Sequence, residues 1–311
     1  MLSKDSTYRG RFAPSPTGPL HFGSLYTAVA SYLQAKANDG KWLLRIDDLD
    51  SFRCKAEYTN KILHTLEQYQ LEWDESVFYQ RSRYDAYQQA LNTLEQQNIL
   101  YPCQCSRKDL SERHVRNGIY DGYCLNHPII PNKAYSVRLK LPQTNISFTD
   151  AVQGTTQQRL QAQVGDFIMF RKDEIHAYHL AVVLDDHEQN ITQVLRGYDL
   201  LHSTYRQIFL QQLLNIPTPD YAHIPVVNGP GGAKLSKQTF AEDVSLSPVR
   251  QTLISVLTHL SLKPPKELLT YRPHEILKWA VRHWSLKNIS PETAIPFNHS
   301  LIGLYVITLF Q

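Results

Sequence analysis

The order of predicted elements in residues 8–46 limits the possible folds more than any other feature of the sequence. Residues 8–13 have the composition of a short strand, and residues 14–19 form a loop rich in proline and glycine. Apolar residues then recur every three or four positions from Ser24, which predicts a helix capped by Ser24 and ended by residues 38–40. A second strand is predicted at residues 41–46. This order is typical of a parallel α/β unit with a right-handed crossover.

An insertion is predicted further along the chain. Helical spacing continues at residues 62–69 and 87–94. Residues 101–160 are instead rich in Cys, Pro, Asn and Gly, with one alternating strand at residues 135–141. We interpret this stretch as an insertion between two halves of one sheet.

The second half of the sheet is predicted to follow the insertion. Strands are expected at residues 166–170 and 181–184, and the pattern becomes helical from about residue 241. The fold class is therefore α/β, a parallel sheet split by an insertion and followed by a helical C-terminal region. The predicted boundaries are 1–100 for the first half of the core, 101–165 for the insertion, 166–240 for the second half and 241–311 for the tail.

Composition and charge exclude several classes of protein. The 311 residues are 42% hydrophobic and 20% charged, which fits a globular protein rather than a disordered one. No apolar run approaches the ~20 residues of a membrane span, and residues 1–5 lack a secretory signal, so we expect a cytoplasmic protein with no membrane partner. The net charge of +3 argues against coating nucleic acid by bulk charge.

The charge surplus is concentrated in the tail. Residues 261–311 contain six Lys or Arg and three Asp or Glu, a surplus equal to the whole net charge of +3. This stretch is either an ordinary solvated helical surface or a modest surface facing a polyanion such as RNA.

Two short motifs point to phosphate chemistry. Residues 19–24 (PLHFGS) lie between the first strand and its helix, where α/β sheets bind phosphates. Gly23 would let a ligand approach the backbone, and His21 could donate a hydrogen bond to a phosphate oxygen. Lys234 and Lys237 stand in a glycine-rich stretch that suits a triphosphate clamp. Taken singly, each motif is also common in structural turns or on solvated surfaces.

Together and in this order, the two motifs resemble the HIGH and KMSKS motifs of the class I aminoacyl-tRNA synthetases. Residues 11–21 (RFAPSPTGPLH) are similar to the opening block of the glutamyl and glutaminyl branch, and residues 44–50 (LRIDDLD) resemble its next block. Residues 181–186 and 192–199 match two later blocks. The resemblance covers about residues 8–237 and implies a Rossmann-like parallel sheet.

The sequence departs from the family pattern at a few positions. Phe22 and Ser24 replace the usual Ile and His of the first motif, and Leu235 replaces Met in the second. Asp47 stands where the branch usually has Glu, so this shorter acid must reach the same substrate atom or use a water.

The resemblance implies a site that activates glutamate with ATP and Mg²⁺. A guanidinium suits the substrate carboxylate and a carboxylate suits its ammonium group, roles that fall to Arg11 and Asp47. The implied catalytic residues are His21, Lys234 and Lys237. The implied glutamate-binding residues are Arg11, Ala13, Ser15, Asp47, Tyr178 and Arg196. The implied ATP-binding residues are His21, Gly23, Ser24, Lys234, Ser236 and Lys237.

The number of residues that follow the second motif narrows the resemblance to one subgroup of the branch. Only 74 residues follow Lys237, so we expect no complete anticodon-binding domain. The resemblance then points to the truncated paralogues of the branch, the glutamyl-queuosine tRNA(Asp) synthetases. These enzymes activate glutamate and transfer it to the queuosine base in the anticodon loop of tRNA(Asp). The implied partners are ATP, L-glutamate and queuosine-containing tRNA(Asp), bound by a monomer.

Three other functions stay open at this point. A shortened glutamyl-tRNA synthetase would charge a tRNA 3′ end, although the expected lack of an anticodon domain argues against it. A different nucleotidyltransferase would share the first motif without the glutamate blocks. A non-catalytic tRNA-binding paralogue would explain the unusual Phe22, Ser24 and Asp47.

The cysteines favour a metal site over disulfides. Cys103, Cys105 and Cys124 fall within 22 residues of the insertion, in a long chain without a secretory signal. Zinc takes four ligands, and composition alone nominates His114 or His127 as the fourth. The resemblance favours Tyr120 instead. The bland alternative is reduced cysteines packed in a small core, while bound zinc would serve to fold the insertion. The fourth cysteine, Cys54, has no evident partner and is interpreted as a free thiol.

Overall fold

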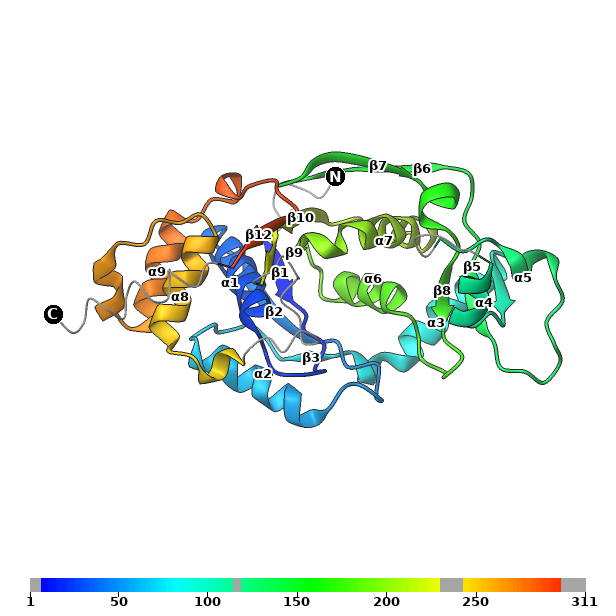
Figure 1. Cartoon of the computed structure of the whole chain (residues 1–311), viewed down its shortest axis with the longest axis horizontal. Coiled ribbons are helices and arrows are strands. Elements are labelled where there is room, and N and C mark those ends of the chain that lie inside the picture. Colours follow the sequence, from blue (N-terminus) through cyan, green and yellow to red (C-terminus); the bar gives the residue numbers. More distant parts are fainter. Residues whose placement is uncertain (1–6, 114–118, 230–242, 298–311) are drawn as a thin grey trace.

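The computed structural model describes residues 7–113, 119–229 and 243–297, which form an elongated α/β protein (Figure 1). Its first unit is β1 (Arg9–Phe12), α1 (Phe22–Ala37) and β2 (Lys41–Ile46), with β1 and β2 in parallel. Next come α2 (Ala56–Gln68) and β3 (Phe78–Tyr79), and β3 extends the parallel sheet beside β2. The predicted strand, loop, helix, strand order is confirmed.

Helix α1 begins three residues before the predicted position. Its N-cap is His21 rather than Ser24, and the His21 ring accepts a hydrogen bond from the Ser24 backbone N–H. Asn38 caps the other end, as the sequence predicts. Gly40 is required there because a Cβ would collide with the carbonyl oxygen of Tyr8.

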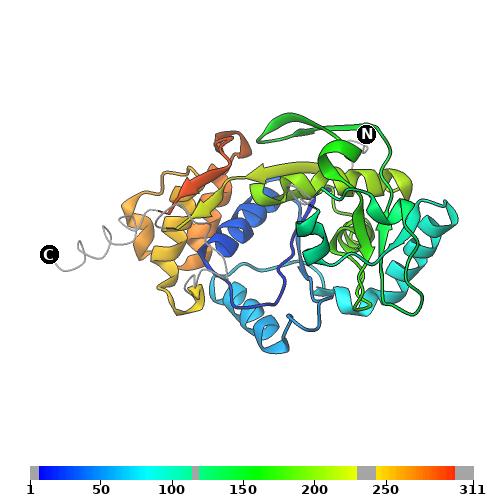
Figure 2. The ribbon, with the colours of Figure 1, turned by 45° about the vertical axis from the view of Figure 1, so that its right-hand side comes forward.

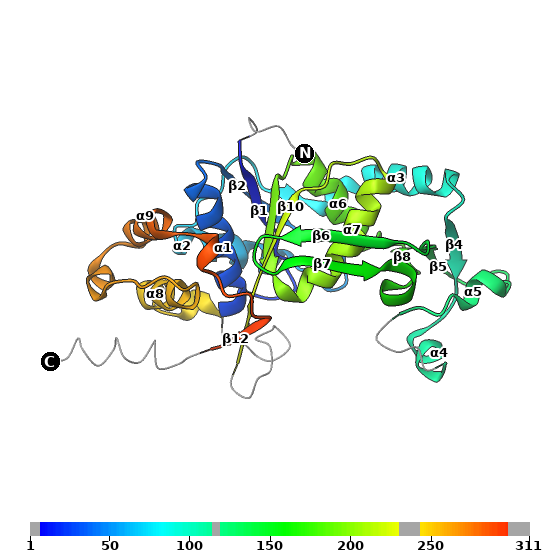
Figure 3. The same cartoon turned by 90° about the horizontal axis from the view of Figure 1, so that it is seen from above.

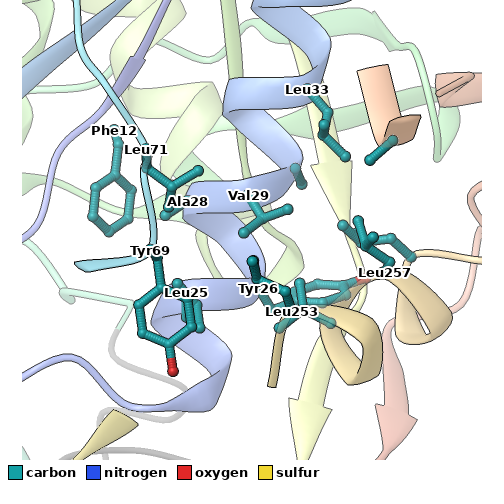
Figure 4. Close-up of a cluster of buried hydrophobic side chains, with 14 of the residues drawn as sticks. Phe12, Leu25, Tyr26, Ala28, Val29, Leu33, Tyr69, Leu71, Leu253 and Leu257 are labelled. Carbon is teal, nitrogen blue, oxygen red and sulfur yellow. The ribbon is translucent and has the colours of Figure 1, made fainter. Parts of the chain in front are cut away.

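One of two clusters of buried hydrophobic side chains surrounds α1. Leu25 and Val29 of α1 lie between Phe12 and the side chains of Leu253 and Leu257 (Figure 4). All five are buried, and each such leucine stabilises the fold by about 1.5–3 kcal/mol relative to an exposed one. This packing fixes the N-terminal end of α1 relative to the strands.

The second half of the parallel sheet lies beside the first. Strand β9 (Gln193–Gly197) pairs in parallel with β10 (Asp220–Ile224). Strand β1 meets this pair at residue 192, where the backbone N–H of Thr192 donates to the Arg9 carbonyl at 2.9 Å. Helices α6 (Tyr178–Glu188) and α7 (Leu201–Leu213) pack against each other on this half.

The prediction of a strand at residues 181–184 is wrong, because these residues belong to α6. Ala181, Val182 and Val183 are all almost completely buried. A short, wholly apolar run has the same appearance in a buried strand and in a buried helix, so periodicity could not separate the two.

The insertion forms its own antiparallel sheet at one end of the molecule. After α3 (Tyr84–Gln96), the sheet has the order β4 (Leu100–Cys103), β5 (Ser136–Leu139), β8 (Phe167–Phe170). The short helices α4 (Arg107–Glu112) and α5 (Tyr123–Asn126) lie beside it. Strand β8 therefore belongs to the sheet of the insertion, although it follows the predicted boundary at residue 165.

A hairpin connects the insertion back to the main sheet. Strand β6 (Asn145–Asp150) pairs antiparallel with β7 (Gly154–Arg159), and Asp150 also pairs in parallel with Tyr221 of β10. Seen from above, β6 runs from the insertion toward the strands of the core and β7 returns toward the insertion (Figure 3). The hairpin thus brings residues of the insertion next to the second half of the sheet.

The tail packs at the opposite end (Figure 2). Helices α8 (Val249–His259) and α9 (Pro273–His283) both contact α1, so the predicted helical region is present. A short strand follows, β12 (Ala294–Pro296), which pairs with β11 (Val226–Asn228). Within the described residues, no helix is both long and apolar enough to cross a membrane.

Candidate active site

A cavity of about 360 Å³ opens at the carboxyl ends of β1 and β9, beside the N-terminal end of α1. Parallel α/β sheets bind nucleotides at this position, because strand ends and a helix N-terminus meet there. Most of the predicted site residues that the structure describes line this cavity: Arg11, Ala13, Ser15, His21, Gly23, Ser24, Tyr178 and Arg196. Lys234, Ser236 and Lys237 lie outside the described residues.

His21 is held at the N-terminal end of α1 by hydrogen bonds with Ser24. Its Nδ1 accepts a hydrogen bond from the Ser24 backbone N–H at 3.3 Å, so a neutral ring carries its proton on Nε2. Nε2 lies 3.1 Å from Ser24 Oγ. The side chain of Ser24, which replaces the usual His of the motif, therefore lies within hydrogen-bond distance of the His21 ring.

Arg11 lines the cavity with its charge already balanced. Its Nε and Nη2 donate to the two carboxylate oxygens of Asp186, at 3.0 and 3.3 Å. Arg45 Nη1 donates to Asp186 Oδ1 at 2.6 Å. Burial would raise the pKa of Asp186, but Arg11 and Arg45 outweigh burial and lower it. The carboxylate of Asp186 therefore stays charged behind the cavity.

Asp47, the predicted ammonium partner, does not line the cavity. Its Oδ1 accepts a hydrogen bond from Arg45 Nε at 2.8 Å, in a nearly completely buried ion pair. Burial raises the pKa of Asp47 although Arg45 acts in the opposite direction. The shorter side chain of Asp is thus held by Arg45.

Arg196 differs from Arg11, because its hydrogen bonds within the described residues all go to uncharged groups. Nε donates to His223 Nε2 at 3.0 Å, while Nη2 donates to Thr204 Oγ1 and to Gln207 Oε1, both at 2.8 Å. Nη1 is buried and has no hydrogen-bond partner in the part of the chain that the structure describes. Arg196 therefore lines the cavity with a guanidinium that forms no ion pair among the described hydrogen bonds and keeps one donor unsatisfied.

Two further residues that line the cavity, Gly197 and Asp199, belong to one of the family blocks but are not among the predicted site residues. A Cβ at Gly197 would stand 2.5 Å from Asp199 Oδ1, so glycine leaves room for this carboxylate. The signal that could have identified Asp199 is its place just after a parallel strand, where ligands of such sheets bind.

The cysteines of the insertion converge as predicted. Sulfur atoms of Cys103, Cys105 and Cys124 all lie within 4.8 Å of one another. The hydroxyl of Tyr120 is 3.5 Å from Cys103 Sγ and 3.4 Å from Cys105 Sγ. Zn–S bonds of about 2.3 Å at tetrahedral angles place sulfur atoms about 3.8 Å apart, so these atoms fit a zinc ion.

The predicted alternatives for the fourth ligand differ in position. His127 stacks on Tyr123 and lies outside the cysteine cluster. His114 is outside the described residues. Burial raises the pKa of Cys103, but hydrogen bonds from Tyr120 and Arg138 outweigh this effect and lower it. A lowered thiol pKa favours the thiolate form that binds a metal.

Comparisons with known proteins agree with this geometry. Residues 7–253 match the family described as tRNA synthetases class I (E and Q), catalytic domain. A protein of Methylococcus capsulatus named glutamyl-Q tRNA(Asp) synthetase is 47% identical over 285 residues, which cover 91% of this chain and 93% of that protein. A protein of Neisseria gonorrhoeae with the same name is 46% identical over 294 residues, covering 93% and 99%.

Solved structures show the same fold. A glutamate tRNA ligase from Elizabethkingia meningosepticum, crystallised with its amino acid, superposes with a TM-score of 0.80 at 24% identity. The match covers 98% of this chain and 70% of that chain. The arrangement of strands around the cavity is therefore that of a class I synthetase fold.

Proposed function

The chain belongs to the class I tRNA synthetases of the glutamate and glutamine branch, and from this premise we propose that it activates glutamate with ATP and transfers it to the queuosine base of tRNA(Asp). The names of the relatives, which the chain matches at 46–47% identity over nearly their whole length, support the acceptor. One structural observation carries the amino-acid half of the proposal: Arg196 lines the cavity, and its buried Nη1 has no hydrogen-bond partner among the described residues.

Arg196 is the proposed anchor for the side-chain carboxylate of glutamate. Arg11 lies in the same cavity, but Asp186 already binds two of its donors. A carboxylate at Arg196 would satisfy the orphaned donor and form a charge-assisted hydrogen bond, which is stronger than a neutral one. Glutamine would offer no charge to balance this guanidinium.

The ammonium group of the substrate is assigned to Asp47 by the resemblance. Because Arg45 holds this carboxylate away from the cavity lining, we propose that Asp47 acts through a bridging water. Asp199 and Tyr178 line the cavity and complete the set of polar groups proposed to surround the substrate, with Ala13 and Ser15 in the loop that follows β1.

The proposed reaction has two steps and needs no protein nucleophile. The α-carboxylate of glutamate attacks the α-phosphorus of ATP, and the bond to pyrophosphate breaks. His21, at the N-terminal end of α1, stabilises the charge that develops on the phosphate oxygens. Lys234 and Lys237 are proposed to neutralise the pyrophosphate. A hydroxyl of queuosine then attacks the glutamyl-adenylate and releases AMP.

Two ions complete the proposal. Mg²⁺ accompanies ATP, as in other class I synthetases. Zinc is proposed to bind Cys103, Cys105, Cys124 and Tyr120, since their sulfur and oxygen atoms have the spacing that zinc needs. It would stabilise the insertion and take no part in the reaction. We further propose that the protein acts as a monomer. The proposed domain boundaries are those predicted from the sequence, except that the insertion extends to include β8, which pairs with β5.

The proposal is tested in two assays. Glutamate-dependent exchange of pyrophosphate into ATP should occur in the wild type, and Lys237→Ala should slow it by about 10²-fold or more. Unchanged exchange in this variant would refute the role of Lys237, and no exchange in the wild type would favour a non-catalytic tRNA-binding protein.

The acceptor is tested with an isolated anticodon stem-loop. A queuosine-containing stem-loop of tRNA(Asp) should accept glutamate, and the same stem-loop with guanosine should not. Charging of full-length tRNA but not of the modified stem-loop would instead show a shortened synthetase that acts on the 3′ end.

A further inference from the structure

Asp150 and His223 form a buried pair directly behind Arg196, outside the residues that line the cavity. Both side chains are fully buried, and His223 Nδ1 lies 2.6 Å from Asp150 Oδ2. Asp150 ends strand β6 of the hairpin and His223 lies on β10. The function described above uses neither residue.

The hydrogen bonds fix the proton of His223. Arg196 Nε can only donate, so His223 Nε2, 3.0 Å away, must accept. The proton of the neutral ring is therefore on Nδ1, which donates to Asp150. A protonated ring would instead direct an N–H at the guanidinium. Burial, together with the nearby charge of Arg196, lowers the pKa of His223 to about 4 although Asp150 acts in the opposite direction.

Asp150 is itself held rigidly by the backbone. Its Oδ1 accepts from the N–H groups of Val152, Gln153 and His223, at 3.0, 2.9 and 3.1 Å. Among the described residues, Oδ2 then contacts only His223, and this contact sets the tautomer of the ring. The hairpin of the insertion thus determines which atom of His223 faces Arg196.

We propose that Asp150 and His223 are positioning residues that hold the guanidinium of the cavity-lining Arg196 in the orientation in which it binds the substrate carboxylate. His223 binds Nε, while Thr204 and Gln207 bind Nη2, so the plane of the guanidinium is fixed on two sides. The identity of the carboxylate as that of glutamate rests on the proposed function.

The test compares variants in steady-state pyrophosphate exchange. His223→Phe and Asp150→Asn should each raise the KM for glutamate by about 10- to 100-fold, since a hydrogen bond to a charged group is lost or reversed. The kcat and the KM for ATP should stay within about twofold of wild type. His223→Gln should restore most of the affinity, because its Oε1 can accept from Arg196 Nε.

Tyr221→Phe is the matched control. It lies two positions from His223 on the same strand and loses a buried hydrogen bond from Gln211, yet it keeps the ring beneath Arg196. Its KM for glutamate should stay within about twofold of wild type. The proposal is overturned if Tyr221→Phe raises this KM as much as His223→Phe, or if His223→Gln is no better than His223→Phe.

A second measurement needs no substrate. Nitrogen-15 spectra of the histidine side chains, with His223 assigned by its loss in His223→Gln, should show Nδ1 protonated and Nε2 unprotonated in the wild type. A proton on Nε2 would overturn the proposal even if exchange is normal. Absence of glutamate-dependent exchange in the wild type, with the expected tautomer present, would refute the proposed function and leave the positioning pair intact.

Discussion

The cavity and the cysteine cluster hold their polar groups in opposite ways. Around the cavity, polar groups of the protein pair with complementary groups: the carboxylate of Asp186 balances the charge of Arg11, and His223 orients Arg196 by accepting a hydrogen bond. In the insertion, groups of the same kind meet, with Cys105 Sγ 3.4 Å from Cys124 Sγ and from Tyr120 Oη. The cavity is therefore organised before any ligand binds, whereas the cluster is the region that the proposed zinc ion would stabilise. Ligand removal should have little effect on one region and a large effect on the other.

Zinc removal should have the largest effect. Structural zinc sites contribute on the order of 10 kcal/mol, so a chelator or Cys105→Ser should unfold the insertion. Hydrogen exchange should then increase in β4, β5 and α5 while α1 stays protected. Cys54→Ser is the control, because the Cys54 thiol only approaches the Asp47 carbonyl, at 3.8 Å, and should change neither metal content nor exchange.

Metal analysis decides this first prediction. Protein purified without chelator should contain about one zinc per chain. If it contains none and the insertion is still protected, the cysteines are packed as a small reduced core and the contrast between the two regions disappears.

The pH dependence of stability should report the buried His223. In the unfolded chain a histidine takes up a proton near pH 6.5, but the folded protein resists protonation down to about pH 4. The lowered folded-state pKa means that this contribution to stability is complete above about pH 6.5 and is lost as the pH falls toward 4. The loss amounts to at most about 3 kcal/mol.

The comparison with His223→Gln isolates this contribution. Other buried histidines, such as His179, whose pKa burial lowers to about 3, act in the same direction in both proteins. The difference in unfolding free energy between wild type and variant should therefore shrink between pH 6.5 and pH 4. A constant difference would mean that His223 is protonated in the folded protein, contrary to its hydrogen bond with Arg196.

Sequence reasoning found the elements that a local pattern determines. The first parallel unit, the insertion, the converging cysteines and the helical tail all follow from spacing and composition. It misplaced residues 181–184, because burial on every side removed the alternation that identifies a strand or a helix. It placed the N-cap of α1 at Ser24 rather than His21, since serine is the commoner cap.

The pair formed by Asp150 and His223 behind Arg196 could not be predicted from the sequence. Asp150 and His223 are 73 positions apart and meet only because β6 pairs with β10 across the insertion. No local pattern in the sequence around Asp150 predicts that β6 pairs with β10. Asp47 shows a different limit: the family position indicated a ligand contact, but the structure holds its shorter side chain on Arg45.

The two arginines of the cavity should respond unequally to substitution. Arg196→Lys loses the fixed fork of donors, so the KM for glutamate in pyrophosphate exchange should rise by about 100-fold. Arg11→Lys should raise it by about 10-fold or less, because an ammonium group can still balance Asp186. An Arg11→Lys effect larger than that of Arg196→Lys would make Arg11 the carboxylate anchor and reverse the proposed roles.

The smallest effect is expected from lengthening Asp47. If a water bridges Asp47 to the substrate ammonium, Asp47→Glu should replace the water with a direct contact and lower the KM for glutamate by about 3-fold, because direct and water-bridged hydrogen bonds differ little in energy. Asp47→Asn should raise the KM for glutamate and also lower the stability of the fold, since Arg45 would lose a buried counter-ion.

Asp48→Glu serves as the control for the added methylene, because Asp48 accepts a hydrogen bond from the Arg81 backbone N–H outside the cavity. An unchanged KM in Asp47→Glu, with a raised KM in Asp199→Asn, would transfer the ammonium contact to Asp199 and show that Asp47 serves only to hold Arg45.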